Sequence, residues 1–283
     1  MEYNFKYKNK EEIFVVKEEK GVPFLQFQAL NQCDIIEHGF STRMGGVSEG
    51  IYSSMNLSYT RGDKEEAVTE NFKRFAAAMG VDWENYVFSD QTHTTNIRVV
   101  TEADRGKGFT KDRDYTDIDG LVTNVKGLVL STFYADCVPL YFVDPKKRAI
   151  GLSHSGWKGT VGEIGRKTIE TMEKEYGSKP EDILVAIAPS ICRECYEVSE
   201  DVANQFMKIF PKEEWKDIMD DKGKGKYQLD LWEINKKILL RSGILKEHLY
   251  VTNLCTCCNS ELLFSHRASQ GKRGNLGAFL CIK

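Results

Sequence analysis

The sequence predicts an α+β fold, in which mixed β-sheets pack together with flanking helices, and one domain over residues 1–283. Short β-branched and aromatic runs outnumber the helical stretches. Several of these runs follow one another directly, which favours mixed sheets over a strict strand–helix alternation. The chain has no repeat, low-complexity tract or long linker, and DDKGKGKYQ (220–228) reads as a surface turn rather than a domain boundary.

The expected strands are short segments rich in valine, isoleucine, phenylalanine and tyrosine, bounded by residues that favour turns. EIFVVK and VPFLQFQ are the first two, and the turn residues EEKG separate them. The full set covers residues 12–17, 22–28, 34–40, 86–89, 96–101, 128–134, 138–144, 149–154, 183–188, 248–252 and 276–282.

The clearest helix covers residues 63–79, DKEEAVTENFKRFAAAM. Asp63 is the expected N-cap, Glu66 stands at the capping-box position three residues later, and Gly80 ends the helix. A second helix is expected over 159–176, ending at Gly177. Two further helices follow from capping residues: Ser199 before 200–209, and Asp230 before a helix that reaches about residue 241.

Composition excludes several classes of protein. The chain is 41% hydrophobic and 29% charged with a net charge of −3, so no overall field attracts nucleic acid or an anionic membrane. Neither an export signal nor a membrane-spanning stretch is evident, which predicts a cytoplasmic protein. Eight cysteines in that compartment indicate thiols, metal ligands or a nucleophile rather than disulfides. No GxGxxG or P-loop motif indicates a nucleotide cofactor.

A β-hairpin predicts that one cysteine and one histidine lie together. The turn DPKKR separates arms 138–144 and 149–154. A two- or four-residue loop pairs residue 144 with 149, so Pro139 faces His154, and Cys137 projects from the same face roughly 7 Å further along the strand. A three-residue loop would reverse this parity. The pair is either a buried thiol and a hydrogen-bonded imidazole or part of a reactive centre.

A catalytic zinc needs three protein ligands and one open position. His93 in SDQTHTTN and His38 in EHGFSTRMGGVS are both suitable third partners, and spacing alone does not choose between them. His248 and His266 read as surface or packing residues. Five histidines in the whole chain limit any metal hypothesis.

Several ordered motifs resemble those of the YfiH/laccase-domain family, described both as polyphenol oxidase-like and as purine nucleoside phosphorylase. The motifs run in order over most of the chain, and the ADC and HSGW motifs together are the most specific. They are HGFSTRMGGVSEG (38–50), DQTHTTNIRVV (90–100), DGLVTN…LSTFYADCVPLYFVD (119–144), GLSHSGWKGT (151–160), APSICRECYEV (around 189–198) and CT…FSHR (255–267).

The resemblance implies a zinc ion on His93, Cys137 and His154 with an open coordination position, and so selects His93 over His38. It also implies phosphorolysis of adenosine, inosine and methylthioadenosine, together with adenosine deamination. The expected partners are therefore a nucleoside and phosphate. Four positions depart from the common family pattern: Thr94 for glycine, Ser155 for alanine, Lys158 for arginine and Ala188 for glycine.

Three further residues are candidates for the chemistry. Zinc lowers the pKa of a bound water, which could then attack the purine C6, whereas phosphorolysis needs a bound phosphate. Arg43 in the glycine-rich loop is the expected phosphate clamp, with Lys158 at a helix start as a second candidate. Asp136 is expected to orient a ligand or accept a proton. Alternatively, Arg43 stabilises a turn and Asp136 satisfies backbone donors.

Other functions fit the same residues. A metal-free hydrolase or deamidase would use Cys137 as nucleophile and His154 as base, and peptidoglycan-precursor editing is a related hydrolytic role. A copper phenol oxidase fits poorly because five histidines without a His-x-His pair do not supply a multicopper site, although adventitious copper could replace zinc. A zinc-dependent binding module is the non-enzymatic alternative.

Two CxxC motifs raise a separate question. CREC (192–195) and CTCC (255–258) could form a second zinc site only if the fold brings them together, because the gap between them is much wider than in zinc ribbons. Packing thiols or a redox-formed bridge is favoured over that site. Cys257 is a fifth thiol without an assigned role. The sequence does not indicate the oligomeric state or the preferred nucleoside.

Overall fold

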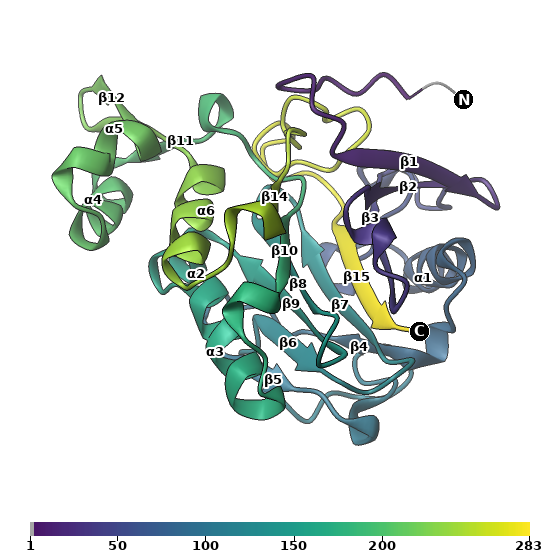
Figure 1. The fold of residues 1–283 in the computed structure, drawn as a ribbon. Coiled ribbons are helices and arrows are strands. Elements are labelled where there is room, and N and C mark those ends of the chain that lie inside the picture. Colours follow the sequence, from purple (N-terminus) through teal and green to yellow (C-terminus); the bar gives the residue numbers. More distant parts are fainter. Residues whose placement is uncertain (1–2) are drawn as a thin grey trace.

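The computed structural model describes residues 3–283, and two six-stranded sheets form its centre (Figure 1). In the first sheet the strand order is β1-β2-β3-β15-β7-β4, and neighbours are antiparallel except for the parallel pair β4 and β7. Its strands are β1 (Phe14–Glu19), β2 (Val22–Phe27), β3 (Ile36–Ser41), β15 (Leu276–Ile282), β7 (Val129–Tyr134) and β4 (Tyr86–Phe88).

The second sheet has the order β14-β10-β8-β9-β6-β5 and contains the hairpin predicted from the sequence. Its two edge pairs, β10 with β14 and β5 with β6, are parallel, and the central pairs are antiparallel. Its strands are β14 (Leu249–Val251), β10 (Leu184–Ile187), β8 (Val138–Asp144), β9 (Ala149–Ser155), β6 (Gly120–Thr123) and β5 (Ile97–Val99).

The main core lies between these two sheets, because alternate side chains of each strand point inward. In β8, Tyr141 and Val143 belong to this core, whereas Leu140 and Phe142 belong to the cluster on the outer face. The Tyr141 hydroxyl donates a hydrogen bond to the Gly39 carbonyl of β3 at 2.9 Å and so joins the two sheets.

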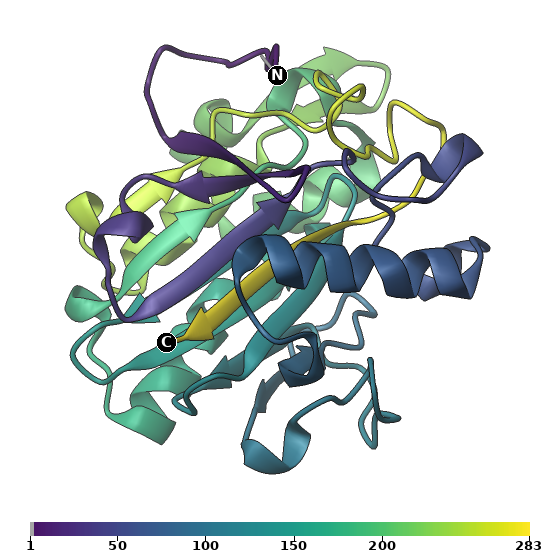
Figure 2. The same cartoon turned by 90° about the vertical axis from the view of Figure 1, so that its right-hand side faces the viewer.

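Helices cover both outer faces, so the α+β prediction is confirmed. α1 lies across the first sheet, on the side away from the second (Figure 2). α3 and α6 pack on the outer face of the second sheet. The helices are α1 (Glu65–Met79), α2 (Trp157–Val161), α3 (Ile164–Tyr176), α4 (Glu200–Ile209), α5 (Trp215–Ile218) and α6 (Leu231–Arg241).

A third, three-stranded sheet was not predicted. It has the order β11-β13-β12 and consists of β11 (Glu197–Ser199), β13 (Lys226–Leu229) and β12 (Met219–Gly223). Residues 220–228, which the sequence analysis read only as a surface turn, therefore form most of a hairpin that turns at Lys224 and Gly225. Strand β6 was also missed, because a four-residue run beginning with glycine gives little alternation to recognise.

The helix boundaries differ from the predictions where capping was invoked. The N-cap of α1 is Lys64, one residue later than expected. Asp63 instead accepts hydrogen bonds from the Lys64 amide and the Asn56 side chain, so no capping box forms. Gly80 ends α1 with φ of +70°, as predicted. Asp230 caps α6 by accepting from the Glu233 amide at 3.0 Å.

The expected helix over 159–176 is two helices, α2 and α3. Glu163 separates them with a left-handed backbone, φ +55°, which a continuous helix does not allow. Gly177 ends α3 as predicted. Ser199 stands at the N-cap of α4, but its hydroxyl donates to the Asp201 carboxylate and not to the helix backbone.

The register of the β8–β9 hairpin is confirmed. Asp144 pairs with Ala149 across a four-residue loop, and Pro139 pairs with His154. The loop is closed by the Asp144 carboxylate, which accepts from the amides of Lys146 and Lys147, both at 2.9 Å. The parity argument therefore places Cys137 and His154 at the same end of the hairpin.

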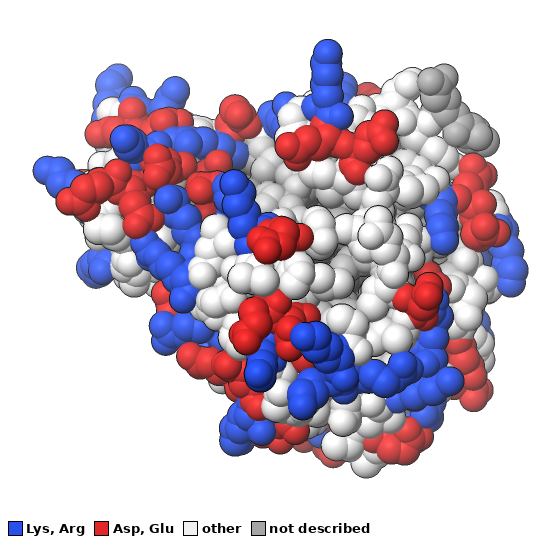
Figure 3. All heavy atoms as spheres, in the orientation of Figure 1, with Lys and Arg blue, Asp and Glu red and all other residues white. Residues whose placement is uncertain are grey.

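Charged side chains of both signs lie interspersed on the face shown in Figure 3, most densely over α4, α5 and β12 at the upper left. This mixture agrees with the small net charge of −3. None of the helices in residues 3–283 combines the length and the apolar character that a bilayer crossing requires.

Candidate active site

Three donor side chains from separate segments meet at one end of the sheet pair. His93 follows β4, Cys137 precedes β8, and His154 lies near the end of β9. Their donor atoms all lie within 4.8 Å of one another. Cys137 Sγ is 3.9 Å from His93 Nε2, and the two imidazole rings stand 4.9 Å apart at 80°. The structure thus brings together all three residues of the expected triad.

His38, the rival third partner, lies elsewhere. It belongs to β3, is 2% exposed, and its Nε2 accepts a hydrogen bond from the Phe27 amide at 2.9 Å. Burial, assisted by nearby positive charge, lowers the pKa of His38 to about 3, so the ring is neutral. His38 therefore serves packing and hydrogen bonding within the first sheet.

A buried carboxylate, Asp119, orients two members of the triad. Asp119 Oδ1 accepts from His154 Nδ1 at 2.7 Å and from the His93 amide at 3.1 Å. Its other oxygen accepts from the amides of Thr92 and Thr94, at 3.1 and 2.8 Å. Because Nδ1 of His154 is engaged, Nε2 is the nitrogen available to the centre of the triad. Burial raises the pKa of Asp119, but these hydrogen bonds outweigh it and the net shift is downward.

The electrostatics of the triad favour a thiolate. Burial disfavours charge at Cys137, but the positive charge of His154 and hydrogen bonds from both imidazoles outweigh it and lower the pKa of Cys137 to about 6. Burial likewise opposes an imidazolium at His154, but the Cys137 thiolate and Asp119 raise the pKa of His154 to about 9. The thiolate is the form of cysteine that binds a metal or attacks an electrophile.

The donor set fits a zinc ion. Two imidazole nitrogens and one thiolate are typical of a catalytic zinc site with a fourth, open position. Gly156 makes the close approach possible, since a Cβ there would lie 2.6 Å from His93 Cδ2 and 3.3 Å from Cys137 Sγ. The Asp119–His154 hydrogen bond is the carboxylate–histidine arrangement that commonly supports a metal-binding imidazole.

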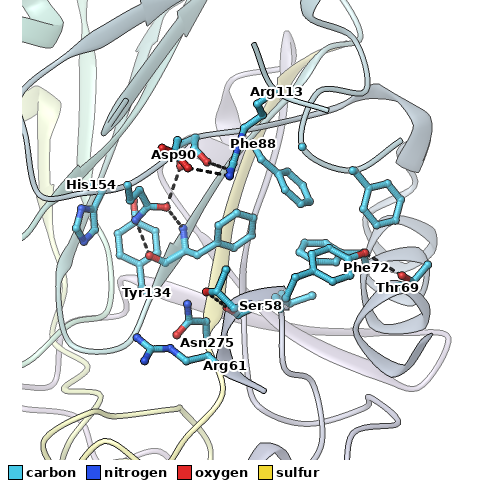
Figure 4. A pocket seen from close by; sticks show the side chains of 18 of the residues that line it. Ser58, Arg61, Thr69, Phe72, Phe88, Asp90, Arg113, Tyr134, His154 and Asn275 are labelled. Carbon is cyan, nitrogen blue, oxygen red and sulfur yellow. Dashed lines mark hydrogen bonds and ion pairs between the residues drawn. The ribbon is translucent and has the colours of Figure 1, made fainter. Parts of the chain in front are cut away.

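A pocket of about 880 Å³ opens beside the triad and is lined by all three of its side chains. Its size lies in the range of small-molecule sites. In Figure 4, Phe72 and Phe88 stand on one side of the pocket, and His154 and Tyr134 stand on the other. The aromatic wall consists of Tyr59, Phe72, Trp83, Phe88, Phe109 and Phe133. Such a wall can stack with a flat heterocycle.

Three arginines line this pocket. Arg113 is paired with Asp90 at 2.7 Å, whereas Arg61 is exposed and Arg273 is only 7% exposed. Arg273 Nη1 donates to the Gly274 carbonyl at 3.2 Å and to Asn275 Oδ1, whereas its Nε has no partner within residues 3–283. Burial and the nearby charge of Arg61 lower the pKa of Arg273 to about 10. Two like charges held in one pocket favour a bound anion.

A second pocket of about 290 Å³ also adjoins the triad and shares His93 and Cys137 with the larger one. Lys158, one of the predicted site residues, lines it, and its Nζ lies 5.7 Å from the Trp157 ring. α2 is only five residues long. Lys158 therefore lines a different pocket from Arg61 and Arg273.

Asp136 also lines the smaller pocket, but its carboxylate is fully engaged. Oδ1 accepts from Thr256 Oγ1 at 2.6 Å, and Oδ2 accepts from the Arg267 amide at 2.7 Å. Its backbone has a left-handed φ of +86° directly before Cys137. These contacts fit the alternative in which Asp136 satisfies donors and fixes the chain beside Cys137.

Arg43 lies outside the residues that line either pocket. Its Nε donates to the Ser53 carbonyl and its Nη1 to the Ser260 carbonyl, both at 2.8 Å, and the guanidinium stacks 4.6 Å from the Phe264 ring. The contacts match the alternative of a structural arginine in a turn. The structure does not bring Arg43 to the triad.

Sequence reasoning assigned no role to Asp119, Arg61 or Arg273. The sequence contained a signal for Asp119, because an acidic residue opens the short apolar segment DGLVT. In the structure this residue is completely buried. Thr94, which replaces a common glycine, donates its hydroxyl to Asp119 at 2.9 Å. The two arginines stand in loops, where an arginine by itself carries no positional signal.

The comparisons with known proteins agree with this geometry. A family model described as "Multi-copper polyphenol oxidoreductase laccase" matches residues 37–283. The chain belongs to this family. The resemblance inferred from the sequence motifs is thereby confirmed. The matched residues include the whole second sheet and, in the first sheet, all strands except β1, β2 and the first residue of β3.

Several laccase-family relatives are similar along most of their length. The purine nucleoside phosphorylase YlmD of Bacillus subtilis is 39% identical over 249 residues, covering 87% of this chain and 88% of that protein. A purine nucleoside phosphorylase of Deinococcus radiodurans is 36% identical over 260 residues, covering 92% and 93%. Crystal structures of YfiH from Bacillus licheniformis and of YlmD from Geobacillus stearothermophilus each give a TM-score of 0.89 at 34% identity, covering 96% of this chain and all of the other.

Proposed function

We propose that this protein is a zinc-dependent purine nucleoside phosphorylase that acts on adenosine, inosine and methylthioadenosine and also deaminates adenosine. One observation carries the proposal: His93, Cys137 and His154 converge beside a pocket that has an aromatic wall and is lined by arginines, Arg61 and Arg273 among them. The names of the similar relatives support the phosphorylase class.

The triad would hold the zinc ion through two imidazole nitrogens and the Cys137 sulfur. When bound, zinc supplies Lewis acidity beside the substrate. Asp119 fixes His154 with Nε2 toward the centre and also holds the His93 amide, so one carboxylate sets the directions of both imidazoles.

The two arginines would bind the phosphate that attacks the nucleoside. In phosphorolysis, a phosphate oxygen forms a bond to the ribose C1′ as the bond from C1′ to the purine nitrogen breaks. The departing electron pair goes to the base, which then takes up a proton. Arg61 and Arg273 match this requirement because a phosphate dianion relieves the repulsion between their two positive charges.

The aromatic wall would hold the purine. Phe72, Phe88 and Phe133 contact one another at ring separations of 4.8 to 5.7 Å, so their positions are mutually fixed. Stacking on such rings accepts adenine and hypoxanthine alike, because each base presents a flat π-face. This supports a substrate range that covers several purine nucleosides.

A chromatographic nucleoside screen on protein of measured zinc content tests the proposed function. Free base together with ribose 1-phosphate, formed only when phosphate is present, supports phosphorolysis. Inosine formed from adenosine without phosphate supports deamination. Zinc-loaded protein that produces neither from any of the three nucleosides contradicts the proposal.

Substituting the rim arginine tests the phosphate site. In Arg61→Ala we expect the KM for phosphate to rise about 10- to 100-fold, because a charge-assisted hydrogen bond contributes roughly 1.5–3 kcal/mol. The KM for the nucleoside should change much less, and Arg61→Lys should restore part of the loss because the charge is kept. The measurement is initial rate against phosphate concentration at saturating inosine.

Arg43→Ala is the matched comparison, since Arg43 was the clamp expected from the sequence. Its contacts to Ser53, Ser260 and Phe264 lead us to expect lower thermal stability with an unchanged phosphate KM. The opposite pattern, with the phosphate KM raised in Arg43→Ala and unchanged in Arg61→Ala, would show that phosphate binds at the glycine-rich loop that contains Arg43.

A metal-free hydrolase is the second candidate, because Cys137, His154 and Asp119 also form a nucleophile–base–carboxylate series. Alkylation of thiols separates the two. If zinc is bound, Cys137 should resist iodoacetamide until a chelator is added. Rapid alkylation of Cys137 in fully active protein would favour the hydrolase.

A further inference from the structure

Four cysteines outside the active site form a cluster of sulfur atoms. Their Sγ atoms all lie within 4.8 Å of one another, although the two CxxC motifs are about 60 residues apart in the chain. The backbone brings the motifs together: Ser190 and Cys255 form a parallel bridge, and the Thr256 amide donates to the Ser190 carbonyl at 3.1 Å. The four-sulfur cluster consists of Cys192, Cys195, Cys255 and Cys258.

The separations match those of a metal site. Four sulfurs at about 2.3 Å from one tetrahedral zinc ion would lie about 3.8 Å from one another. Cys195 Sγ and Cys258 Sγ are 3.5 Å apart. The upper limit of 4.8 Å for the whole cluster leaves only small side-chain movements before all four sulfurs reach a common centre.

Backbone amides already point at one of the sulfurs. The amides of Cys192 and Cys258 donate to Cys255 Sγ at 3.3 and 3.4 Å. These two contacts hold Cys255 Sγ in a fixed position beside the other three sulfurs. Lys8, whose ammonium binds Glu194 at 3.0 Å, also faces Cys192 and Cys258 and adds positive charge at the cluster.

The cluster is largely shielded from solvent. Cys255 is fully buried and Cys192 is 2% exposed, while Cys195 and Cys258 are half-buried. If the four thiols served only to fill apolar space, two backbone amides would not need to donate hydrogen bonds to one of their sulfurs. A tetrahedral cation would satisfy all four sulfurs at once.

We propose that the four-sulfur cluster binds a zinc ion as a closed structural site, separate from the active-site triad. Zinc is the cation that four thiolates from two CxxC motifs most commonly bind. The donors occupy all four tetrahedral positions, so the site has no open position for catalysis. The proposal does not depend on the function proposed for the triad.

Hydrogen bonds also connect the four-sulfur cluster to the active site. Both motifs hold Asp136: the Ile191 amide, next to Cys192, donates to its backbone carbonyl at 3.0 Å, and Thr256, next to Cys255, donates to its carboxylate at 2.6 Å. Asp136 directly precedes the triad residue Cys137. A zinc ion that joins the motifs therefore fixes the backbone on one side of the triad.

Zinc content per chain tests this site. We expect two zinc ions in the unmodified protein, one in Cys258→Ser and one in Cys137→Ala, because each variant removes a ligand of a different site. Cys257→Ser is the matched control: it removes a thiol from the same turn but not from the cluster, and should retain both ions. A Cys258→Ser chain with as much zinc as the unmodified protein overturns the proposal.

If Cys258→Ser does not fold, alkylation of the unmodified protein tests the site instead. Under reducing conditions, the four cluster cysteines should resist alkylation and should become reactive as a chelator removes one zinc ion. Four cysteines that react at once in zinc-loaded protein overturn the site. So does a disulfide between Cys195 and Cys258, seen as a mass lower by two hydrogens.

Discussion

Cys137→Ala is expected to lower kcat/KM for inosine phosphorolysis about 10³-fold or more. Removal of the thiolate leaves two imidazoles, which are too few protein ligands for a stable catalytic zinc site. Loss of Lewis-acid stabilisation costs several kcal/mol, and each 1.36 kcal/mol is a tenfold change in rate. Steady-state rates with inosine and phosphate, measured together with the zinc content, check this prediction.

The zinc content of Cys137→Ala distinguishes loss of the metal from loss of a nucleophile as the cause of the lower activity. Zinc binding should fall by one ion per chain, whereas the folded structure should persist because Cys137 lies at the edge of a pocket. Cys33→Ala is a suitable control, since Cys33 is another unpaired, half-buried cysteine and lies outside both pockets. Activity within a few-fold of normal in Cys137→Ala would contradict the proposed site. Loss of activity with full zinc content would instead favour a nucleophilic cysteine.

Asp119→Asn is expected to weaken zinc binding about 10- to 100-fold and to lower the free energy of unfolding by about 1–3 kcal/mol. Asp119 accepts hydrogen bonds on both oxygens, from His154 and His93 on one and from Thr92 and Thr94 on the other. An amide has only one acceptor oxygen, so its NH₂ group must face donors on one side. Chelator competition and denaturant unfolding measure the two effects.

Asp117→Asn provides a close control for Asp119→Asn. Asp117 is exposed and accepts from the Thr92 hydroxyl at 2.7 Å, so it contacts the loop that carries His93 but touches neither imidazole. Its zinc affinity should remain within about twofold of normal. Equal losses in the two variants would show that loop stability, and not the orientation of the imidazoles, controls zinc binding.

Local rules predicted the part of the site that lies on a single hairpin. The parity of the β8–β9 loop placed Cys137 and His154 together, because pairing at the turn determines which side chains share a face. The choice of His93 over His38 came from the family resemblance. No local rule could make that choice, since both histidines lie in polar motifs and only the packing of the first sheet places His38 far from the triad.

The remaining site residues depend on contacts between distant segments. Arg273 and Arg61 are more than 200 residues apart and line the same pocket; Arg273 lies shortly before β15, a central strand of the first sheet. The cysteine motifs at 192 and 255 were judged more suited to packing or a disulfide, because their separation in sequence gave no measure of their separation in space. The prediction that Asp63 caps α1 was wrong for a related reason: the side chain of Asn56, from a preceding loop, donates a hydrogen bond to the Asp63 carboxylate.

The position of β15 has a consequence for synthesis of the chain. Residues 276–282, the yellow strand in Figure 2, lie inside the first sheet and pair with β3 on one side and β7 on the other. Ile282 pairs with Ile36. A nascent chain leaving the ribosome has the flanking strands long before this central one. Until β15 is made, the facing edges of β3 and β7 keep unpaired backbone N–H and C=O groups. Completion of the first sheet must therefore wait for contacts between residues that are far apart in the sequence.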